Sequence, residues 1–181
     1  YRLLNNLSFS LSTDGSINTM NANMADFAHP TRYSWLTAIA GKYVNEWFTL
    51  SASALATVIN EQADKGGSAG NHRKLTPYVS ATFKPFRNEE FRVRFFYKDI
   101  FRLPSFNDLY YQEVGNSKLK PENARQYNIG LTYSRNVCTF LPYLSATVDA
   151  YYNKVTDKII AYPTKNLAVW SMRNLGSVEI K

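Results

Sequence analysis

The sequence predicts an all-β fold of antiparallel up-and-down strands, which fits a transmembrane β-barrel segment or a soluble sandwich or barrel, and three observations lead to this prediction. Aromatic residues make up 15% of the 181 residues, although the mean hydropathy is only −0.34. Apolar and polar residues alternate with a period of two in several segments, which is typical of strands with one apolar and one hydrated face. Long and short connections alternate between these segments, as they do between the two rims of a transmembrane barrel.

The first predicted strands differ in regularity. In residues 1–12, one face carries Leu3, Leu7, Phe9 and Leu11, while the other carries Asn6 and the serines. Residues 31–43 are aromatic and apolar but alternate poorly, whereas residues 47–60 set Phe, Leu, Ala and Val against Thr and Ser throughout. We predict a strand in each of the three segments, and the last is the clearest.

The later strands repeat this pattern with larger side chains. Residues 75–85 alternate Leu, Val, Ala and Phe with Thr, Ser and Lys, and residues 91–98 place Arg and Lys on one face only. Residues 124–135 and 143–154 alternate Tyr, Ile, Leu and Val with Gln, Asn, Thr and Asp. An eighth strand is expected in the C-terminal part of the chain, within 157–162 or within 174–181.

The connections between the strands alternate in length. Short ones are predicted near residues 44–46, 87–90 and 136–141. Long ones, rich in Asn, Asp, Gly, Ser and Lys, are predicted near residues 13–30, 61–74, 102–122 and 155–173. Aromatic side chains near strand ends could form the girdles that mark membrane interfaces or could be ordinary core residues: Tyr33, Trp35, Tyr43, Trp47, Tyr143 and Tyr152.

The composition argues against several other classes of protein. No window approaches the roughly 18 to 20 apolar residues of a membrane helix, and no signal sequence precedes the first strand. The one cysteine, Cys138, is expected to be a small apolar filler, and the two histidines, His29 and His72, lie too far apart in the sequence for a metal motif. The formal net charge of +7 is scattered, which disfavours nucleic acid but is compatible with anionic lipid headgroups or ligands.

Catalysis is not expected either. The sequence contains no G-x-S-x-G elbow, no H-E-x-x-H helix and no phosphate-binding glycine loop. We therefore expect a protein that is not an enzyme and that needs no cofactor.

A dense motif between residues 101 and 130 narrows the prediction. The stretch reads FRLPSFNDLYYQEVGNSKLKPENARQYNIG. It resembles the signature of TonB-dependent outer-membrane receptors, and residues 148–160, VDAYYNKVTDKII, resemble the strand that follows in that family. The matching positions are Phe101, Arg102 and Pro104, then Leu109 and Tyr110, then Gly115, Asn116 and Leu119, then Lys120, Pro121 and Glu122, and finally Tyr127 and Gly130.

The resemblance implies that residues 1–181 are a later part of a 22-stranded barrel and supply about seven to eight of its strands. Because the chain starts at Tyr1 and stops at Lys181 within an expected strand, we expect a segment excised from a longer protein, without the plug domain and the C-terminal strands. In the family the boxes flank an extracellular loop and organise its base. Arg102 and Glu122 are therefore expected to make structural polar contacts.

The resemblance also implies active uptake of a large, scarce nutrient across the outer membrane of a Gram-negative bacterium. The implied partners are the TonB–ExbB–ExbD system acting through the plug, outer-membrane lipid, and a ligand such as a corrinoid (vitamin B12), a siderophore or heme; a surface lipoprotein is left open. Residues 105–115 lack the histidine found there in related heme receptors, which weakens heme. The segment FNDLYY, residues 106–111, resembles corrinoid or siderophore receptors of Bacteroidetes type most closely. We therefore favour a corrinoid as the ligand.

Candidate ligand contacts lie in the predicted outer loops. Aromatic rings could cover a flat macrocycle, and amides could donate hydrogen bonds to it. These candidates are Phe106, Asn107, Tyr110, Tyr111 and Gln112, together with His29 and His72, whose plainer interpretation is solvated loop residues.

Two alternative functions remain at this point. A stand-alone eight-stranded outer-membrane barrel could have a structural or adhesive role, since eight strands can close. A soluble β-sandwich binding module would also show two-faced strands.

Overall fold

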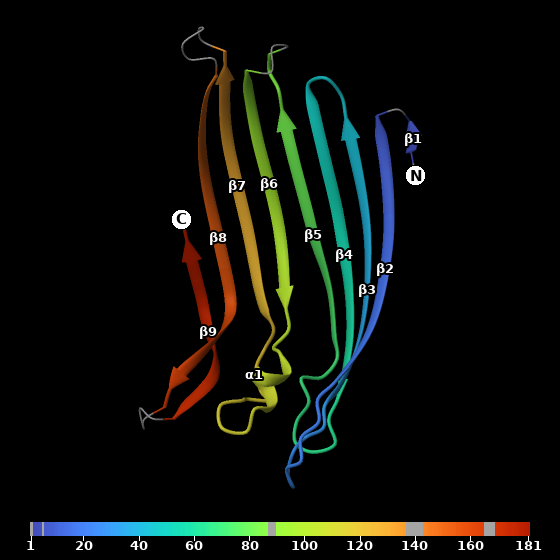
Figure 1. Ribbon diagram of the computed structural model, residues 1–181, viewed down its shortest axis with the longest axis vertical. Helices are drawn as coiled ribbons and strands as arrows, with labels where there is room; N and C mark the ends of the chain where they lie inside the picture. The colour runs from blue at the N-terminus through green and yellow to red at the C-terminus, as the bar shows by residue number, and fades with distance from the viewer. Residues whose placement is uncertain (1, 5, 87–89, 137–142, 165–168) are drawn as a thin grey trace.

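The computed structural model describes residues 2–4, 6–86, 90–136, 143–164 and 169–181. Within these residues the chain forms one antiparallel sheet of nine strands, and each strand pairs with its neighbours in sequence (Figure 1). The strands are β1 (Arg2–Leu4), β2 (Leu7–Thr19), β3 (Thr31–Val44), β4 (Phe48–Gln62), β5 (His72–Phe83), β6 (Phe91–Arg102), β7 (Glu122–Arg135), β8 (Leu144–Pro163) and β9 (Trp170–Ile180). This sequential order confirms the up-and-down prediction, and a Greek-key sandwich would need non-sequential neighbours.

Several predicted boundaries are wrong. The expected strand 1–12 is two strands, and β2 continues through Thr19 because it pairs with β3 along its whole length. The expected long connection 155–173 contains the end of β8 and the start of β9, which pair from Asn153–Ile180 to Pro163–Trp170. Cross-strand pairing overrides the polar composition of these segments. Cys138 and parts of the predicted short turns lie outside the described residues.

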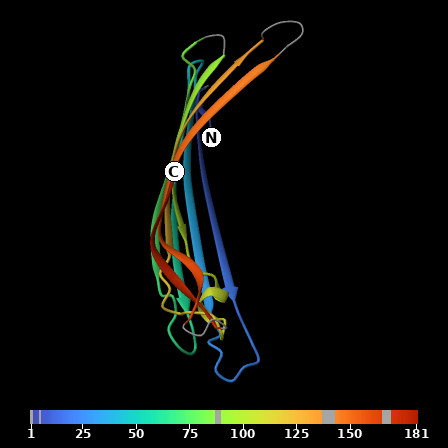
Figure 2. The ribbon, with the colours of Figure 1, turned by 90° about the vertical axis from the view of Figure 1, so that its left-hand side faces the viewer.

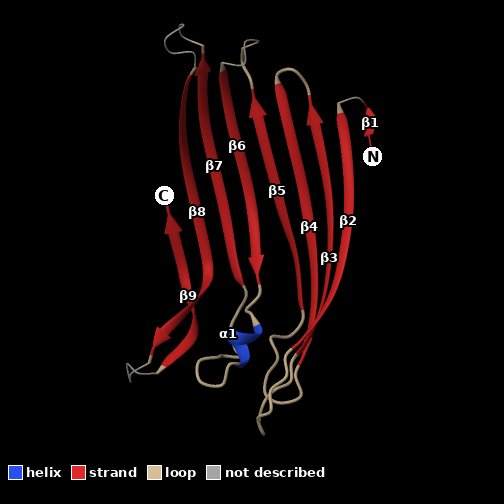
Figure 3. Ribbon diagram, viewed as in Figure 1, coloured by secondary structure: helices blue, strands red, loops and turns tan. Residues whose placement is uncertain are grey.

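The connections alternate between the two rims of the sheet as predicted, but the β8–β9 connection, which was expected to be long, spans only residues 164–169 because both strands extend into it. The short connections lie at one end, at the top of Figure 1, and the β2–β3, β4–β5, β6–β7 and β8–β9 connections lie at the other, which we call the long-loop end. One short helix, α1 (Phe106–Tyr110), lies within the β6–β7 connection and was not predicted (Figure 3). Among the described residues, no helix is long and apolar enough to cross a bilayer.

The strand register assigns side chains to two faces. Residues paired in antiparallel strands lie on the same face, so the pairs Ile39–Ala54, Phe95–Ile129 and Leu131–Val148 share one apolar face. Many of its large side chains are exposed, among them Leu11, Tyr33, Trp35, Ile39, Tyr43, Leu75, Phe95, Ile129 and Val148. We call this side the apolar face and the opposite side, which carries Arg32, Glu61, Arg102 and Glu122, the polar face. The sheet is curved, and α1 lies on its concave side (Figure 2).

The pairing of β5 with β6 is the shortest among the long strands. It runs only from Tyr78–Lys98 to Phe83–Val93, although both strands continue toward the long-loop end. Pro77 stands where the pairing stops, and proline has no N–H to donate to a ladder. A cavity of about 520 Å³ lies beside this separation and is lined by Ser53, Leu55, Thr57, Thr76, Tyr78 and Lys98 to Phe101.

Candidate functional site

Most of the buried side chains gather at the long-loop end. Their apolar core consists of Phe27, Leu109, Tyr110, Leu119 and Ile159, which come from the β2–β3 connection, the β6–β7 connection and β8. We call this core, with the polar residues around it described below, the long-loop cluster. The cluster packs α1 and the β6–β7 connection against the polar face of the sheet.

Helix α1 is held at its first turn by a capping box. The Asp108 backbone N–H donates to Ser105 Oγ at 3.2 Å, and the Ser105 N–H donates to Asp108 Oδ2 at 2.9 Å. Such reciprocal bonds satisfy amides that a helix start leaves without partners. The preceding Pro104 is fully buried, which fixes the direction from which the chain enters the helix.

A buried carboxylate, that of Glu61 on β4, ties α1 to the sheet. Its side chain has no exposed surface, and Oε2 accepts a hydrogen bond from Arg32 Nε at 2.7 Å and lies 2.6 Å from Arg32 Nη2 in an ion pair. Oε1 accepts from the Ala69 N–H at 3.1 Å and from the Tyr110 hydroxyl. Because three hydrogen-bond donors and the Arg32 guanidinium share one carboxylate, the charge of Glu61 is compensated within the protein.

Arg32 extends the same network from β3 to the β6–β7 connection. Its Nη2 donates to the Pro104 carbonyl at 2.8 Å, and its guanidinium lies 4.7 Å from the centroid of the Phe106 ring. Arg32 therefore contacts the chain on both sides of the helix start, which a lysine could not do with one ammonium.

Tyr110 is affected by this environment. Burial, together with the hydrogen bond to Glu61, raises the pKa of the Tyr110 hydroxyl well above its ordinary value near 10.0. The hydroxyl therefore remains a donor at physiological pH. Tyr110 acts here as a structural contact between α1 and β4.

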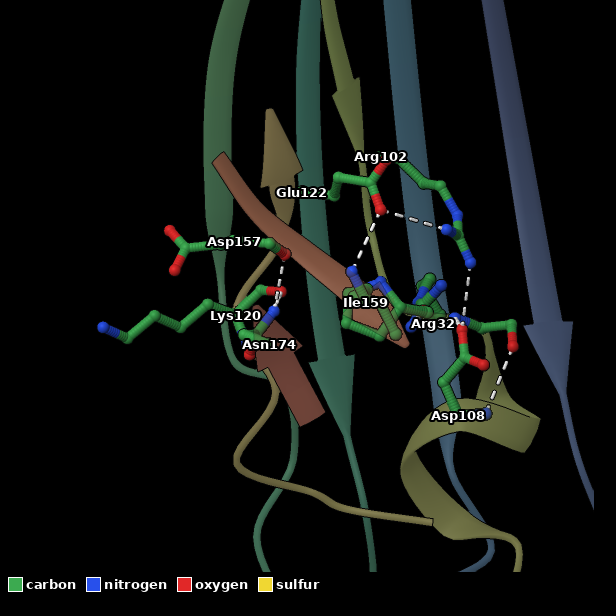
Figure 4. A network of polar contacts seen from close by, with 10 residues as sticks. Arg32, Arg102, Asp108, Lys120, Glu122, Asp157, Ile159 and Asn174 are labelled. Carbon is green, nitrogen blue, oxygen red and sulfur yellow. Dashed lines mark hydrogen bonds and ion pairs between the residues drawn. The ribbon is translucent and has the colours of Figure 1, made fainter. Parts of the chain in front are cut away.

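A second polar group joins the two strands that flank the β6–β7 connection (Figure 4). Arg102 at the end of β6 donates to Glu122 Oε2 and to Asp108 Oδ2, each at 3.3 Å. Glu122 Oε2 also accepts from the Ile159 N–H at 3.1 Å. Thus the family-motif residues Arg102 and Glu122 lie together and link β6, β7, β8 and α1.

The glycine of the next box occupies a position that a larger residue could not share. A Cβ on Gly115 would lie 2.6 Å from the Tyr111 carbonyl oxygen and 2.9 Å from the Leu109 carbonyl carbon. The neighbouring Asn116 donates through Nδ2 to the Met172 carbonyl at 3.0 Å, and the Met172 N–H donates to Val114 O at 2.8 Å. The box therefore closes the turn after α1 and attaches it to β9.

Asn174 on β9 connects the start of β7 to β8. Asn174 accepts through Oδ1 from the Lys120 N–H at 2.8 Å and donates through Nδ2 to the carbonyls of Lys120 and Asp157 at 2.9 and 2.7 Å (Figure 4). Asp157 has a positive φ of 54°, which marks an irregularity in β8. Asn174 thus holds this irregularity and the start of β7 together.

The predicted ligand contacts differ in how far they are buried and in which residues they touch. Phe106 is half-buried against Tyr110, whereas Asn107, Tyr111 and Gln112 are exposed, with Tyr111 at 54%. His29 Nδ1 lies 3.3 Å from Asn21 Oδ1, and its ring packs edge-on against Phe27. His72 Nε2 lies 2.7 Å from Ala69 O, and its ring packs against Phe101. The exposed contacts in the β6–β7 connection are therefore the polar and aromatic residues Asn107, Tyr111 and Gln112.

Sequence reasoning missed Arg32, Glu61 and Asn174, although they join the most separated segments. Arg32 lay at the start of the predicted strand 31–43, Glu61 lay at the start of the predicted connection 61–74, and Asn174 began one of the two alternatives for the eighth strand. The capping box Ser105-x-x-Asp108 was also missed, although it carries a sequence signal that could have been read locally. In the described part of the chain, no group of three His, Cys, Asp or Glu could hold a metal ion.

Comparisons with known proteins place the chain in one family of β-barrel receptors. The model of the family described as TonB dependent receptor-like, beta-barrel matches residues 5–181. By sequence, the chain is 27% identical over 208 residues to a Vitamin B12 transporter BtuB of Vibrio vulnificus, with 94% of this chain and 32% of the relative covered. It is also 31% identical over 85 residues to BtuB of Photobacterium profundum, with 45% and 13% covered.

Solved structures show the same fold. The FrpB iron transporter from Neisseria meningitidis (F3-3 variant) superposes with a TM-score of 0.69 at 14% identity, over 98% of this chain and 30% of that chain. The F5-1 variant gives 0.67 at 15% identity, again over 98% and 30%. The chain therefore spans about a third of the length of the relatives that it matches along most of its own length.

Proposed function

Because the chain belongs to the TonB-dependent receptor-like β-barrel family, whose model matches residues 5–181, we propose that it forms part of the barrel wall of an outer-membrane transporter that takes up a corrinoid. The observation that carries the choice of ligand is the sequence similarity to vitamin B12 transporters, over 94% of the chain in one case. The FrpB iron transporters support the fold, and an iron complex is the alternative that the binding experiment below separates.

In this proposal the two faces of the sheet meet different surroundings. The exposed apolar face contacts the lipid of the outer membrane of a Gram-negative bacterium, where large apolar side chains are stable without a protein partner. The concave polar face lines the barrel and meets the plug domain. The plug transmits energy from TonB, ExbB and ExbD, and the chain itself has no catalytic role.

The long-loop cluster then holds the β6–β7 connection over the mouth of the barrel. Its apolar core and the Glu61 carboxylate fix α1 on the polar face, so Asn107, Tyr111 and Gln112 project from a rigid base. Rigid presentation reduces the entropy lost on binding. We propose that Tyr111 covers part of the corrin ring while the two amides donate hydrogen bonds to it.

The first test is equilibrium binding of cyanocobalamin, with hemin as competitor, to the full-length receptor purified from outer membranes in detergent. Tight binding of cyanocobalamin that hemin does not displace supports the corrinoid proposal. A folded barrel that binds no cyanocobalamin overturns it and leaves iron complexes.

A variant test addresses the loop itself. Tyr111→Ala is expected to weaken cyanocobalamin binding about tenfold, since removing an aromatic contact at a binding surface commonly has an effect of this size. The matched control is Tyr33→Ala, which removes an exposed tyrosine on the apolar face, outside the β6–β7 connection. This variant is expected to bind cyanocobalamin with unchanged affinity. Equal affinities for the two variants would place the ligand contacts elsewhere. The similarity to receptors of Bacteroidetes type stays a prediction, and the presence of a partner lipoprotein at the cell surface stays an open possibility.

A further inference from the structure

The apolar face carries an ordered aromatic row that crosses the middle parts of β6 and β8 and the first half of β7. Tyr97, Tyr127 and Tyr152 are paired in register across these strands, with ring centroids 5.0 and 6.1 Å apart. On β6 the apolar stretch from Phe91 to Tyr97 is about 20 Å long at about 3.3 Å per residue. This length is comparable with the apolar band of a membrane barrel, which aromatic rows border. The tyrosine row therefore marks one edge of that band.

A charged row follows two residues further toward the long-loop end. Asp99, Arg125, Lys154 and Glu179 are direct neighbours across β6, β7, β8 and β9, on the same face as the tyrosines. By contrast, the apolar face of β2, β3 and β4 carries no charged side chain in register with the described pairs. The row therefore lies beyond the apolar band of β6 to β9, and on β5 the same face carries a single charged side chain, Arg73, opposite Val58.

The order of charges within the row is unusual. Arg125 and Lys154 lie directly opposite each other, and like charges at such positions repel. Their carboxylate neighbours lie on the outer sides, with Arg125 Nε 3.6 Å from Asp99 Oδ1 and Lys154 Nζ 3.7 Å from Glu179 Oε1. Both distances exceed those of good hydrogen bonds. The cationic side chains are 62% and 45% exposed, so their donors are accessible from the membrane side.

We propose that Arg125 and Lys154 form a binding site for a phosphorylated headgroup of an outer-leaflet lipid. A phosphate between the two side chains would accept from both and relieve their repulsion, and Arg suits the planar, bidentate contact that phosphate offers. The acyl chains would lie along the apolar band, beside Tyr127 and Tyr152. Lys181, whose Nζ lies 5.8 Å from the centroid of the Tyr152 ring, adds a third cation at this edge. The inference rests on the proposed placement of the chain in an outer-membrane barrel.

The experiment uses the full-length receptor in a neutral detergent, titrated with diphosphorylated lipid A and followed by native mass spectrometry. The test variant is Arg125→Gln combined with Lys154→Gln. Each cation near an anionic lipid surface contributes roughly fivefold in affinity, so the double variant is expected to bind about 30-fold more weakly. The matched control is Lys42→Gln combined with Lys98→Gln, which removes the same charge from the polar face and is expected to bind as the unchanged receptor does.

The outcomes separate this inference from the proposed function. Heat-modifiable migration on gels and cyanocobalamin binding report whether each variant is a folded receptor. If both variants are folded and bind lipid A equally, the headgroup site is wrong while the transporter proposal stands. If dephosphorylated lipid A binds as tightly as the phosphorylated form, or inorganic phosphate alone competes at equal concentration, the site is not a lipid phosphate site. Failure of the unchanged receptor to form a barrel would instead overturn the proposed function.

Discussion

The strand wall and the long-loop cluster satisfy their side chains in different ways. In the middle of the wall, Ile39, Ile129 and Val148 are 58%, 52% and 70% exposed, so their partners lie outside this chain. In the cluster, Leu109, Leu119 and Ile159 are at most 7% exposed and are covered by the chain itself. The wall therefore depends on its environment for stability, whereas the cluster resembles the core of a small soluble domain.

The ion pairs of the strand wall and of the long-loop cluster differ in how far they are exposed to solvent. On the wall, ion pairs such as Arg94–Asp149, at 3.1 Å, have side chains about 40% exposed and are screened by solvent. In the cluster, Glu61 is buried and satisfied by several donors. The same type of contact is thus of small energetic value in one region and of large value in the other, and the following predictions test this difference.

The largest effect is expected from Glu61→Ala. The variant leaves the guanidinium of Arg32 without its carboxylate partner and the hydroxyl of Tyr110 without its acceptor, and removing one partner of a buried pair costs about 3 to 5 kcal/mol. Hydrogen exchange of the β6–β7 connection should therefore show a corresponding loss of protection. Asp26→Ala, which removes an exposed partner of Lys65, is the control and should change protection by less than about 1 kcal/mol. Similar losses in both variants would contradict the distinction between the two regions.

An arginine placed on the strand wall tests which face of the sheet contacts lipid. Ile129→Arg is expected to lower the free energy of unfolding of the bilayer-inserted receptor by about 2 to 4 kcal/mol, because the midplane of a bilayer disfavours arginine on the lipid face. Its neighbour Asn128 lies on the polar face, and Asn128→Arg is expected to have little effect. Urea unfolding from phospholipid vesicles measures both. Equal destabilisation by the two variants would mean that the faces are assigned incorrectly.

Gly115→Ala tests the packing of the turn after α1. The added Cβ would lie within 3 Å of three backbone atoms, and overpacking of this kind typically costs about 1 to 3 kcal/mol. The β6–β7 connection should become more sensitive to limited proteolysis. Gly67→Ala, whose Cβ would lie 3.8 Å from Ser117 Oγ, serves as the control and should be cleaved at the original rate.

The smallest effect concerns pH. Because the pKa of Tyr110 is raised in the folded state, its contribution to stability is complete below the unfolded value near 10.0 and is lost as the pH rises through the folded pKa. The cluster should therefore weaken only in alkaline solution above about pH 10. An ultraviolet titration of tyrosinate should show a late-titrating hydroxyl that Tyr110→Phe removes. An unchanged titration curve in that variant would show that Tyr110 is not held by Glu61.

Local patterns predicted much of the strand wall. Period-two alternation found the strands because each residue of an antiparallel sheet faces the opposite side from the next, and this holds without knowledge of neighbours. The alternation failed in β2 beyond residue 12 and in β8 beyond residue 154. There the polar side chains belong to strands that leave the apolar band, and only their pairing with β3 and β9 reveals them.

The amino-acid sequence by itself determined the two-faced strands, three of the four expected long connections and the motif between residues 101 and 130. These features depend on periodicity, chain length and local residue types. Only the tertiary structure decided that Arg32, Glu61 and Tyr110 meet, that Asn174 joins β7 to β8 and β9, and that Arg125 and Lys154 face each other. Such contacts join residues tens of positions apart, and they depend on strand register, which shifts whole rows of side chains together.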